Sequence, residues 1–353
     1  MTDPRPRVSA VLRRFAAARG DALRGIDADL APFVRVAEDV LLGDGKRVRP
    51  AFCYWGWRGA GGPDCDEIVR AAASLEVLHA CALVHDDVMD GSELRRGQPS
   101  AHRRLAALHR DEALPGDPEG FGRSAAILLG DLFLTWADDL LMASGLAPGA
   151  LARAWPTYAR MRGELVAGQY LDLTGAPVDD TGRARADGGR VARIAQYKTA
   201  GYTVIRPLQL GAVLAGPRPG LLAAYAEFGR PLGAAFQLRD DVLDLFGDPA
   251  VTGKPVGSDL RAGRPNALLS LALHHADPAT ATRLRALVGL PSPPGAVERA
   301  RELITACGAL AAAEERIAAD TAAALAALAA SDLDEITRDA LTGLAIAATA
   351  RAH

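Results

Sequence analysis

The sequence from Val69 to Asp90 reads VRAAASLEVLHACALVHDDVMD, and it decides the fold. Up to His85 it is apolar almost all round, which is typical of a helix buried inside a bundle. Three aspartates, Asp86, Asp87 and Asp90, follow at its end. Asp86 and Asp90 are four residues apart, so their carboxylates share one helical face.

The rest of the chain is also predicted to be helical. Strand patterns are nearly absent, while helical periodicity recurs between Gly/Pro-rich stretches. No linker is long enough to separate domains, so we expect residues 1–353 to form a single all-α domain around the central helix. The expected helices span residues 66–89, 123–143, 151–173, 191–214, 221–245, 265–275, 296–330 and 333–351.

Composition narrows the class of protein. The 353 residues are 49% hydrophobic and 24% charged, which excludes disordered and collagen-like chains. The net charge of −3 leaves no basic excess for binding duplex nucleic acid, so no nucleic-acid partner is expected.

Location follows from three further expectations. We find no signal peptide and no stretch with the character of a membrane span. The four cysteines are scattered without zinc-ligand spacing. They are interpreted as reduced thiols, and we expect a cytoplasmic protein.

The aspartate pattern occurs twice. Residues 236–244 read FQLRDDVLD and place Asp240, Asp241 and Asp244 at the end of another apolar helix. One such pattern could be a solvated helix end, but two make that interpretation weak. Clustered carboxylates repel one another, and at a helix C-terminus the dipole disfavours them as well. Hard oxygen ligands without Cys or His favour Mg²⁺.

Cations accompany both clusters. Only three of the 40 basic residues are lysine, and they are Lys46, Lys198 and Lys254. A lysine that is kept where arginine is otherwise used suggests a phosphate contact. Metal-binding carboxylates, basic loops and an apolar bundle interior together indicate a ligand with several phosphate charges and a hydrocarbon tail, such as a prenyl diphosphate.

With these motifs in order, the sequence resembles the trans-isoprenyl diphosphate synthases of the polyprenyl synthetase family. The resemblance covers nearly the whole chain. It rests on GKRVRP (45–50), HDDVMD with ELRRGQPSAH (85–102), LLGDLFL (128–134), GQYLDL (168–173), Lys198-Thr199, FQLRDDVLD (236–244) and GKPVGSDLRAGRPN (253–266).

The resemblance implies mostly antiparallel helices around a deep central cavity, usually in a homodimer. It implies head-to-tail condensation of isopentenyl diphosphate with an allylic diphosphate, with three Mg²⁺ ions per active site. It also assigns roles to residues: metal binding by Asp86, Asp87, Asp90, Asp240, Asp241 and Asp244; isopentenyl diphosphate binding by Lys46, Arg49, His79 and Arg96; allylic diphosphate binding by Arg95, Lys198, Lys254 and Arg264; and the cleavage side by Lys198, Thr199, Gln237 and Lys254.

Product length is expected to depend on the face of the central helix below Asp86. In the family, an aromatic floor often stands four and five residues before the first aspartate. Here those residues are Ala82 and Cys81, both small, and the next bulky side chains are Leu78 and Leu75. Each helical turn adds ~5.4 Å of depth, roughly one isoprene unit. We therefore expect a product longer than C15, with C20 geranylgeranyl diphosphate favoured over C15 or C25 and above.

Other functions remain open alternatives. A class I terpene cyclase would share the fold, but it normally lacks a second DDxxD and the isopentenyl cation site. A head-to-head synthase fails on the same grounds, and a non-catalytic regulatory subunit tends to lose an aspartate motif. One departure weakens a residue assignment: the last family block usually reads GKxT, whereas this chain has Arg264 where the lysine is expected.

Overall fold

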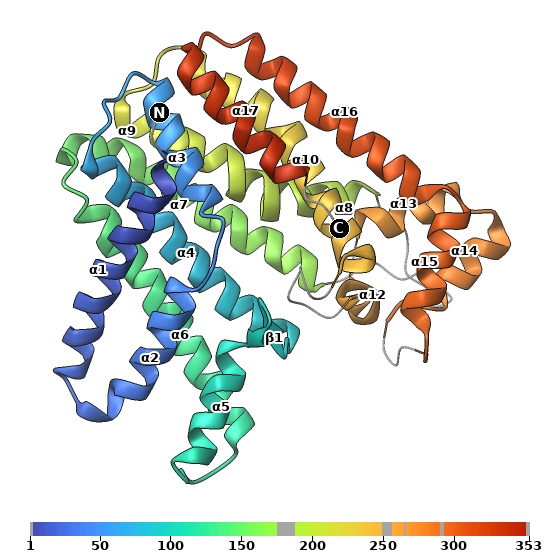
Figure 1. Ribbon diagram of the computed structural model, residues 1–353, viewed down its shortest axis with the longest axis horizontal. Helices are drawn as coiled ribbons and strands as arrows, with labels where there is room; N and C mark the ends of the chain where they lie inside the picture. Colours follow the sequence, from blue (N-terminus) through green and yellow to red (C-terminus); the bar gives the residue numbers. More distant parts are fainter. Residues whose placement is uncertain (1–2, 175–187, 249–255, 265, 290–292, 351–353) are drawn as a thin grey trace.

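The computed structural model describes residues 3–174, 188–248, 256–264, 266–289 and 293–350. The described residues form a bundle of helices with one short hairpin, which confirms the expected all-α fold class (Figure 1). The elements are α1 (Pro4–Arg24), η1 (Ala28–Leu30), α2 (Ala31–Leu42), α3 (Val48–Gly59), α4 (Asp66–Asp90), β1 (Leu94–Arg95), β2 (Gln98–Pro99), α5 (Ala101–Asp111), α6 (Pro118–Met142), α7 (Pro148–Leu173), α8 (Gly188–Ile194), η2 (Ala195–Ile205), α9 (Arg206–Ala215), α10 (Leu221–Phe246), α12 (Ser258–Ala262), α13 (Ala267–His275), α14 (Pro278–Arg285), α15 (Ala296–Ala306), α16 (Ala309–Ala329) and α17 (Glu335–Thr349).

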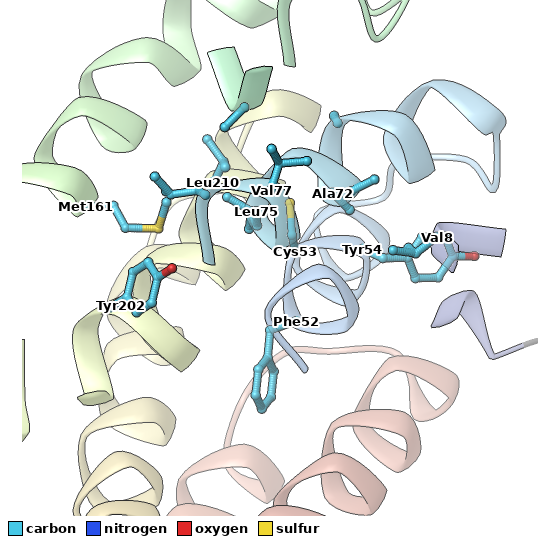
Figure 2. Close-up of a cluster of buried hydrophobic side chains, with 14 of the residues drawn as sticks. Val8, Phe52, Cys53, Tyr54, Ala72, Leu75, Val77, Met161, Tyr202 and Leu210 are labelled. Atoms are coloured by element: carbon cyan, nitrogen blue, oxygen red, sulfur yellow. The ribbon is translucent and has the colours of Figure 1, made fainter. Parts of the chain in front are cut away.

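Helix α4 is the buried centre that its sequence predicts. It packs against α1, α3 and α6, and Leu75 and Val77 join Cys53 of α3 in one apolar cluster (Figure 2). By length and composition α4 could cross a membrane, alone among the helices of the described residues, yet 72% of its most apolar window is buried inside the bundle. Its apolar character is therefore accounted for by the protein core.

The end of α4 fixes where its aspartates lie. Gly91 ends the helix in the left-handed conformation, with φ of 61°, and the Ser92 amide donates to the Asp87 carbonyl at 3.0 Å. The chain then turns back through the antiparallel pair β1–β2, whose two turn residues, Arg96 and Gly97, both have positive φ. The first aspartate cluster thus occupies the last helical turn, and the hairpin arginines follow directly.

Helix α10 connects two apolar cores. Its first half, with Phe228 and Leu232, belongs to the cluster built around α4. Its second half, with Leu238 and Val242, belongs to a smaller cluster with α13, α15 and the start of α16. The second aspartate cluster stands at the end of α10, where this smaller core supports it.

The segment before α9 is a wide helix. Residues Ala195–Ile205 adopt π-helical geometry, which is rare and occurs often at functional sites. Glycines of both neighbouring helices lie against it. A Cβ on Gly233 of α10 would stand 2.0 Å from the Cβ of Ala200. A Cβ on Gly168 of α7 would stand 2.7 Å from the backbone nitrogen of Lys198. Close packing thus holds Lys198 and Thr199 between α7 and α10.

The structure departs from the expected helices in identifiable places. The helix expected over 296–330 is divided, because Gly308 has φ of 80° and begins α16 as its N-cap. Helices α1, α2, α3, α5, α12 and α14 were missed. Helix α6 begins at Pro118 rather than at 123, because the Asp117 carboxylate caps its first amides. Residues 265 and 351, at the ends of two expected helices, lie outside the described part of the chain.

Helices α3 and α9 cross with their backbones in contact. A Cβ on Gly56 would stand 2.1 Å from the Leu208 carbonyl oxygen, and one on Gly211 would stand 1.9 Å from that of Cys53. No side chain larger than hydrogen fits either place without moving a helix, so this crossing depends on both glycines.

We therefore predict that Gly211→Ala lowers the free energy of unfolding by at least about 2 kcal/mol, since α9 must move away from α3. The matched control is Gly343→Ala on α17, where a Cβ would meet nothing within 4 Å. That change should raise stability by about 0.5–1 kcal/mol, because alanine favours a helix. Urea unfolding followed by circular dichroism measures both, and equal stabilities would contradict the backbone contact.

Candidate active site

The first aspartate cluster is divided between three neighbours. Asp86 accepts a hydrogen bond from Nε2 of Gln169 in α7 at 2.8 Å. Asp87 is buried and accepts from Nε of Arg95 at 2.9 Å. Asp90 pairs with Nη2 of Arg264 at 2.6 Å. Only Asp86 and Asp90 therefore share the face toward the site, while Asp87 holds the hairpin arginine beside them.

The second cluster is bound into the surrounding backbone. Asp241 is buried and accepts from Nε2 of Gln237 at 2.8 Å and from the Ala267 amide, the first residue of α13, at 2.7 Å. Asp244 accepts from the hydroxyl of Ser258 and, at 3.2 Å, from the amide of Asp259. Asp240, the first aspartate of this cluster, is half-buried. Two carboxylates thus anchor the ends of α12 and α13.

The wide helix η2 places a lysine between the two clusters. Nζ of Lys198 lies 2.6 Å from Oδ2 of Asp172 and 3.5 Å from Oδ1 of Asp86. The hydroxyl of Thr199, one residue on, donates to Oε1 of Gln237, the residue that also contacts Asp241. Neighbouring residues of η2 therefore join two polar groups, one shared with α4 and α7 and the other with α10.

Free space lies among these polar groups. A small cavity, open to solvent, is lined by residues from α7, α8, η2, α10, α12 and α13, namely Asp172, Val191, Ile194, Ala195, Lys198, Gln237, Asp241, Asp259, Arg264 and Ala267. The lining combines apolar residues of α8 with charged side chains, including Lys198 and Arg264, which suits a ligand with a phosphate head.

Burial and the crowding of carboxylates raise the pKa values of three aspartates in the site. Burial and the nearby Asp86 raise the pKa of Asp90 to about 6, although Arg264 opposes the shift. Burial and Asp259 raise the pKa of Asp241 to about 8. Burial and Asp244 raise the pKa of Asp259 to about 6. Such a site favours any added cation, because a cation relieves both the burial and the repulsion.

The donor set fits magnesium. The described residues include no group of three His, Cys, Asp or Glu side chains arranged to hold a metal ion by themselves. Mg²⁺ does not need such a group, since it binds one or two carboxylates and keeps waters or substrate phosphates as its other ligands. The half-buried Asp86, Asp240 and Asp244 offer oxygens of this kind.

A second group of cations lies beside the middle of α4, around His79. Arg49 donates to the hydroxyl of Thr203 at 2.9 Å, and its guanidinium lies 4.5 Å from the ring centroid of Tyr202. His79 is half-buried next to Tyr202, with ring centroids 6.3 Å apart. Lys46 is exposed at the edge of this region. Residues predicted to bind isopentenyl diphosphate are therefore brought together from α3, α4 and the loop before α3.

A buried carboxylate organises this second group. Glu76 of α4 accepts a hydrogen bond from Nη1 of Arg47 at 2.6 Å, and Arg47 also donates to the Gly43 carbonyl at 3.0 Å. The Arg47 backbone is left-handed, with φ of 47°. A Cβ on Gly45 would stand 3.2 Å from Glu76 and 3.3 Å from the Arg96 guanidinium. Arg96 of the hairpin thus reaches the loop before α3, which carries Lys46 and Arg47.

The remaining predicted residues are Lys254 and the four expected to set product length. Lys254 lies outside the described residues. Of the residues expected to set product length, Leu75, Leu78 and Cys81 are buried, whereas Ala82 is partly accessible. Ala82 shares that accessibility with His79, Leu83 and Asp86, so the partly open stripe of α4 runs through Ala82.

Sequence reasoning missed several side chains that complete the site. Gln169, Asp172 and Asp259 stand in quoted motifs but received no role. Glu76 was absorbed into the apolar description of α4. The sequence signal is clearest for Glu76, a charged residue inside an otherwise apolar helix. In the structure the three carboxylates are each paired with a cation, and Gln169 donates to Asp86.

The comparisons with known proteins agree with this geometry. The family model of the polyprenyl synthetases matches residues 32–306. A geranylgeranyl diphosphate synthase of Mycobacterium tuberculosis is 36% identical over 82% of this chain and 77% of its own. An octaprenyl diphosphate synthase of Escherichia coli is 29% identical over 93% of both chains. The crystal structure of geranylgeranyl pyrophosphate synthase from Corynebacterium glutamicum, complexed with isoprenyl diphosphate and magnesium, is 40% identical, with a TM-score of 0.90 over 99% of this chain and 98% of that one.

The chain therefore belongs to the polyprenyl synthetase family, and it is an isoprenyl diphosphate synthase that makes trans-prenyl diphosphates.

The acidity of His79 yields a prediction. Burial, followed by the charges of Arg49 and Arg96, lowers the pKa of His79 well below its ordinary value of 6.5. The unfolded chain then binds this proton more readily than the folded protein, so stability falls as pH drops below about 6.5. Replacing His79 by Gln should make the loss of stability between pH 7 and pH 5 smaller. His275→Gln, an exposed change on α13, should leave the loss as in the wild type.

Thermal unfolding at a series of pH values measures both variants. An identical pH dependence in His79→Gln and the wild type would show that this imidazole is not held neutral by its surroundings.

Proposed function

We propose that the protein condenses isopentenyl diphosphate head-to-tail with an allylic diphosphate, with geranylgeranyl diphosphate (C20) as its main product. The observation that carries the proposal is that Lys198 and Arg264, which line the cavity together with Asp241 of α10, also pair with Asp86 and Asp90 at the end of α4. The separate basic group around Arg49 and His79 supports a second diphosphate site.

The metal dependence is part of the proposal. Mg²⁺, with three ions per site as in the family resemblance, would be held by the two aspartate clusters, where crowded carboxylates favour a cation. When bound, it would stabilise the negative charge that develops on the departing diphosphate. Asp87 would act by holding Arg95, because its carboxylate is taken up by that guanidinium.

The chain's own residues account for the rest of the reaction. Lys198, Arg95 and Arg264 supply positive charge near the allylic diphosphate, and Thr199 and Gln237 fix the side from which it leaves. The apolar residues of α8 and η2 exclude water, which would otherwise capture the allylic cation. The isopentenyl double bond then forms the new carbon–carbon bond, and the released diphosphate takes the proton.

Assembly and location complete the proposal. We propose a homodimer, because α6 and α7 leave large apolar side chains exposed, including Leu128 at 64% and Val166 at 68%. The cytoplasmic location is supported by the cysteines, all four of which are free. A single domain over 1–353 is supported by α10 and α16, each of which contributes to both apolar cores.

The proposed reaction is tested by turnover with labelled isopentenyl diphosphate and each allylic primer, with Mg²⁺ or with a chelator. Asp86→Ala and Asp240→Ala should each lower turnover at least about a hundredfold with unchanged helical circular dichroism, because each removes a charged oxygen ligand. Asp139→Ala is the matched control: it removes an aspartate of α6 that pairs with Arg19 at 3.1 Å, and it should stay active.

The same assay separates the rival functions. A terpene cyclase would consume the allylic diphosphate without isopentenyl diphosphate. A regulatory subunit would be inactive until a partner synthase is added. Turnover that survives in either aspartate variant would contradict the two-cluster site.

Product length gives a separate prediction. Ala82→Phe should shorten the main product from C20 to C15, since a ring would fill the accessible stripe of α4 one turn below Asp86. Ala82→Ser, a small-for-small change, should leave the length unaltered. Chromatography of the products after full conversion with excess isopentenyl diphosphate measures both. A wild-type product of C15, or no shortening by phenylalanine, places the limit elsewhere.

A further inference from the structure

Arg264 joins the two acidic sides of the site directly. Its Nη2 lies 2.6 Å from Oδ1 of Asp90 at the end of α4, and its Nη1 lies 3.5 Å from Oδ1 of Asp259 in α12. The Asp90 side chain is only 7% exposed, so this guanidinium covers a carboxylate that has little access to water. One arginine therefore neutralises acids that belong to two different helices.

The backbone around Arg264 is held in place. Gly263 ends α12 with φ of 68°, and the Arg264 amide donates to the Asp259 carbonyl at 3.0 Å. On the other side, Asn266 caps α13 by accepting from the Leu269 amide at 3.1 Å. The side chain thus extends from a fixed point, and only its guanidinium needs to move to exchange partners.

The surroundings of this guanidinium are strongly acidic. Burial alone would lower the pKa of Arg264, yet its pKa is raised, because Asp90, Asp259, Asp172 and Asp86 all lie near it. Lys198 is engaged by Asp86 and Asp172. Among the described residues, Arg264 is the only basic side chain that forms an ion pair with Asp90 within 4 Å.

An arginine suits this position better than the lysine usual in the family motif. Its planar fork can direct different N–H groups at two carboxylates, whereas an ammonium is a single point charge. The same fork can bind a phosphate through two parallel hydrogen bonds. A phosphate bound through both Nη groups of Arg264 would take the N–H groups that now face Asp90 and Asp259, so the two kinds of partner compete.

We infer that Arg264 is an exchangeable counter-ion that links metal binding to diphosphate binding. Without metal it pairs with Asp90 and Asp259, and it competes with a metal ion for these carboxylates. When metal and diphosphate arrive together, the carboxylates pass to the metal and the guanidinium pairs with the diphosphate. This inference rests on the proposed metal-dependent function, and it predicts that Arg264 opposes one ligand and favours the other.

The test is calorimetric titration of the full chain with Mg²⁺ alone, and with inorganic diphosphate at saturating Mg²⁺. Arg264→Gln should bind Mg²⁺ alone about tenfold more tightly, because the competing cation is gone, and should bind diphosphate about tenfold more weakly, because a charged contact is lost. Arg264→Lys keeps the charge without the fork and should lie between. Arg261→Gln, which removes the same charge three residues away, should match the wild type.

The outcomes are distinct. Equal or weaker binding of Mg²⁺ alone by both Arg264 variants overturns the inference, and it leaves the proposed function intact if wild-type turnover requires Mg²⁺. Failure of the wild type to bind Mg²⁺ even with diphosphate contradicts the proposed function itself. Loss of both affinities together in Arg264→Gln shows a structural role and also overturns the exchange.

Discussion

Repulsion between carboxylates held at the ends of buried helices is the constraint on which the rest of the structure depends. Asp86 and Asp90 stand where the dipole of α4 already disfavours negative charge. Each is met by a donor or cation from a different element: Gln169 from α7, Lys198 from η2 and Arg264 from the segment after α12. The polar network is therefore what binds the apolar helices into one site.

The two apolar cores hold the helices that carry these polar side chains. The larger core fixes α4 and its hairpin, and the smaller one fixes the end of α10 with α12 and α13. Because α10 passes through both, the second aspartate cluster is held by the same rigid helix that packs on η2. Precision at the site thus comes from helix packing rather than from loops.

Much of this arrangement could be predicted from sequence. The all-round apolar pattern located α4, and the four-residue spacing located Asp86 and Asp90 on one face. Asp87 shows the limit of spacing, because its partner Arg95 lies across a turn whose shape depends on positive φ at Arg96 and Gly97. Asp172, Asp259 and Glu76 could not be found by periodicity, since their roles depend on which helices meet. The division at Gly308 was missed because alanine-rich sequence favours a helix on both sides of it.

The wide turns of η2 carry a consequence for how this chain tolerates change in length. A π-helix holds more residues per turn than an α-helix, so the run through α8, η2 and α9 stays continuous while its two ends are rotated relative to each other. Loss of one residue within 195–205 could be absorbed by tightening these wide turns to α-helical ones. Helix α8 would then keep Val191 and Ile194 toward the cavity, and α9 would keep its packing on α3. The change would fall on the widened backbone around Lys198 and Thr199, the part of the run that lies between α7 and α10.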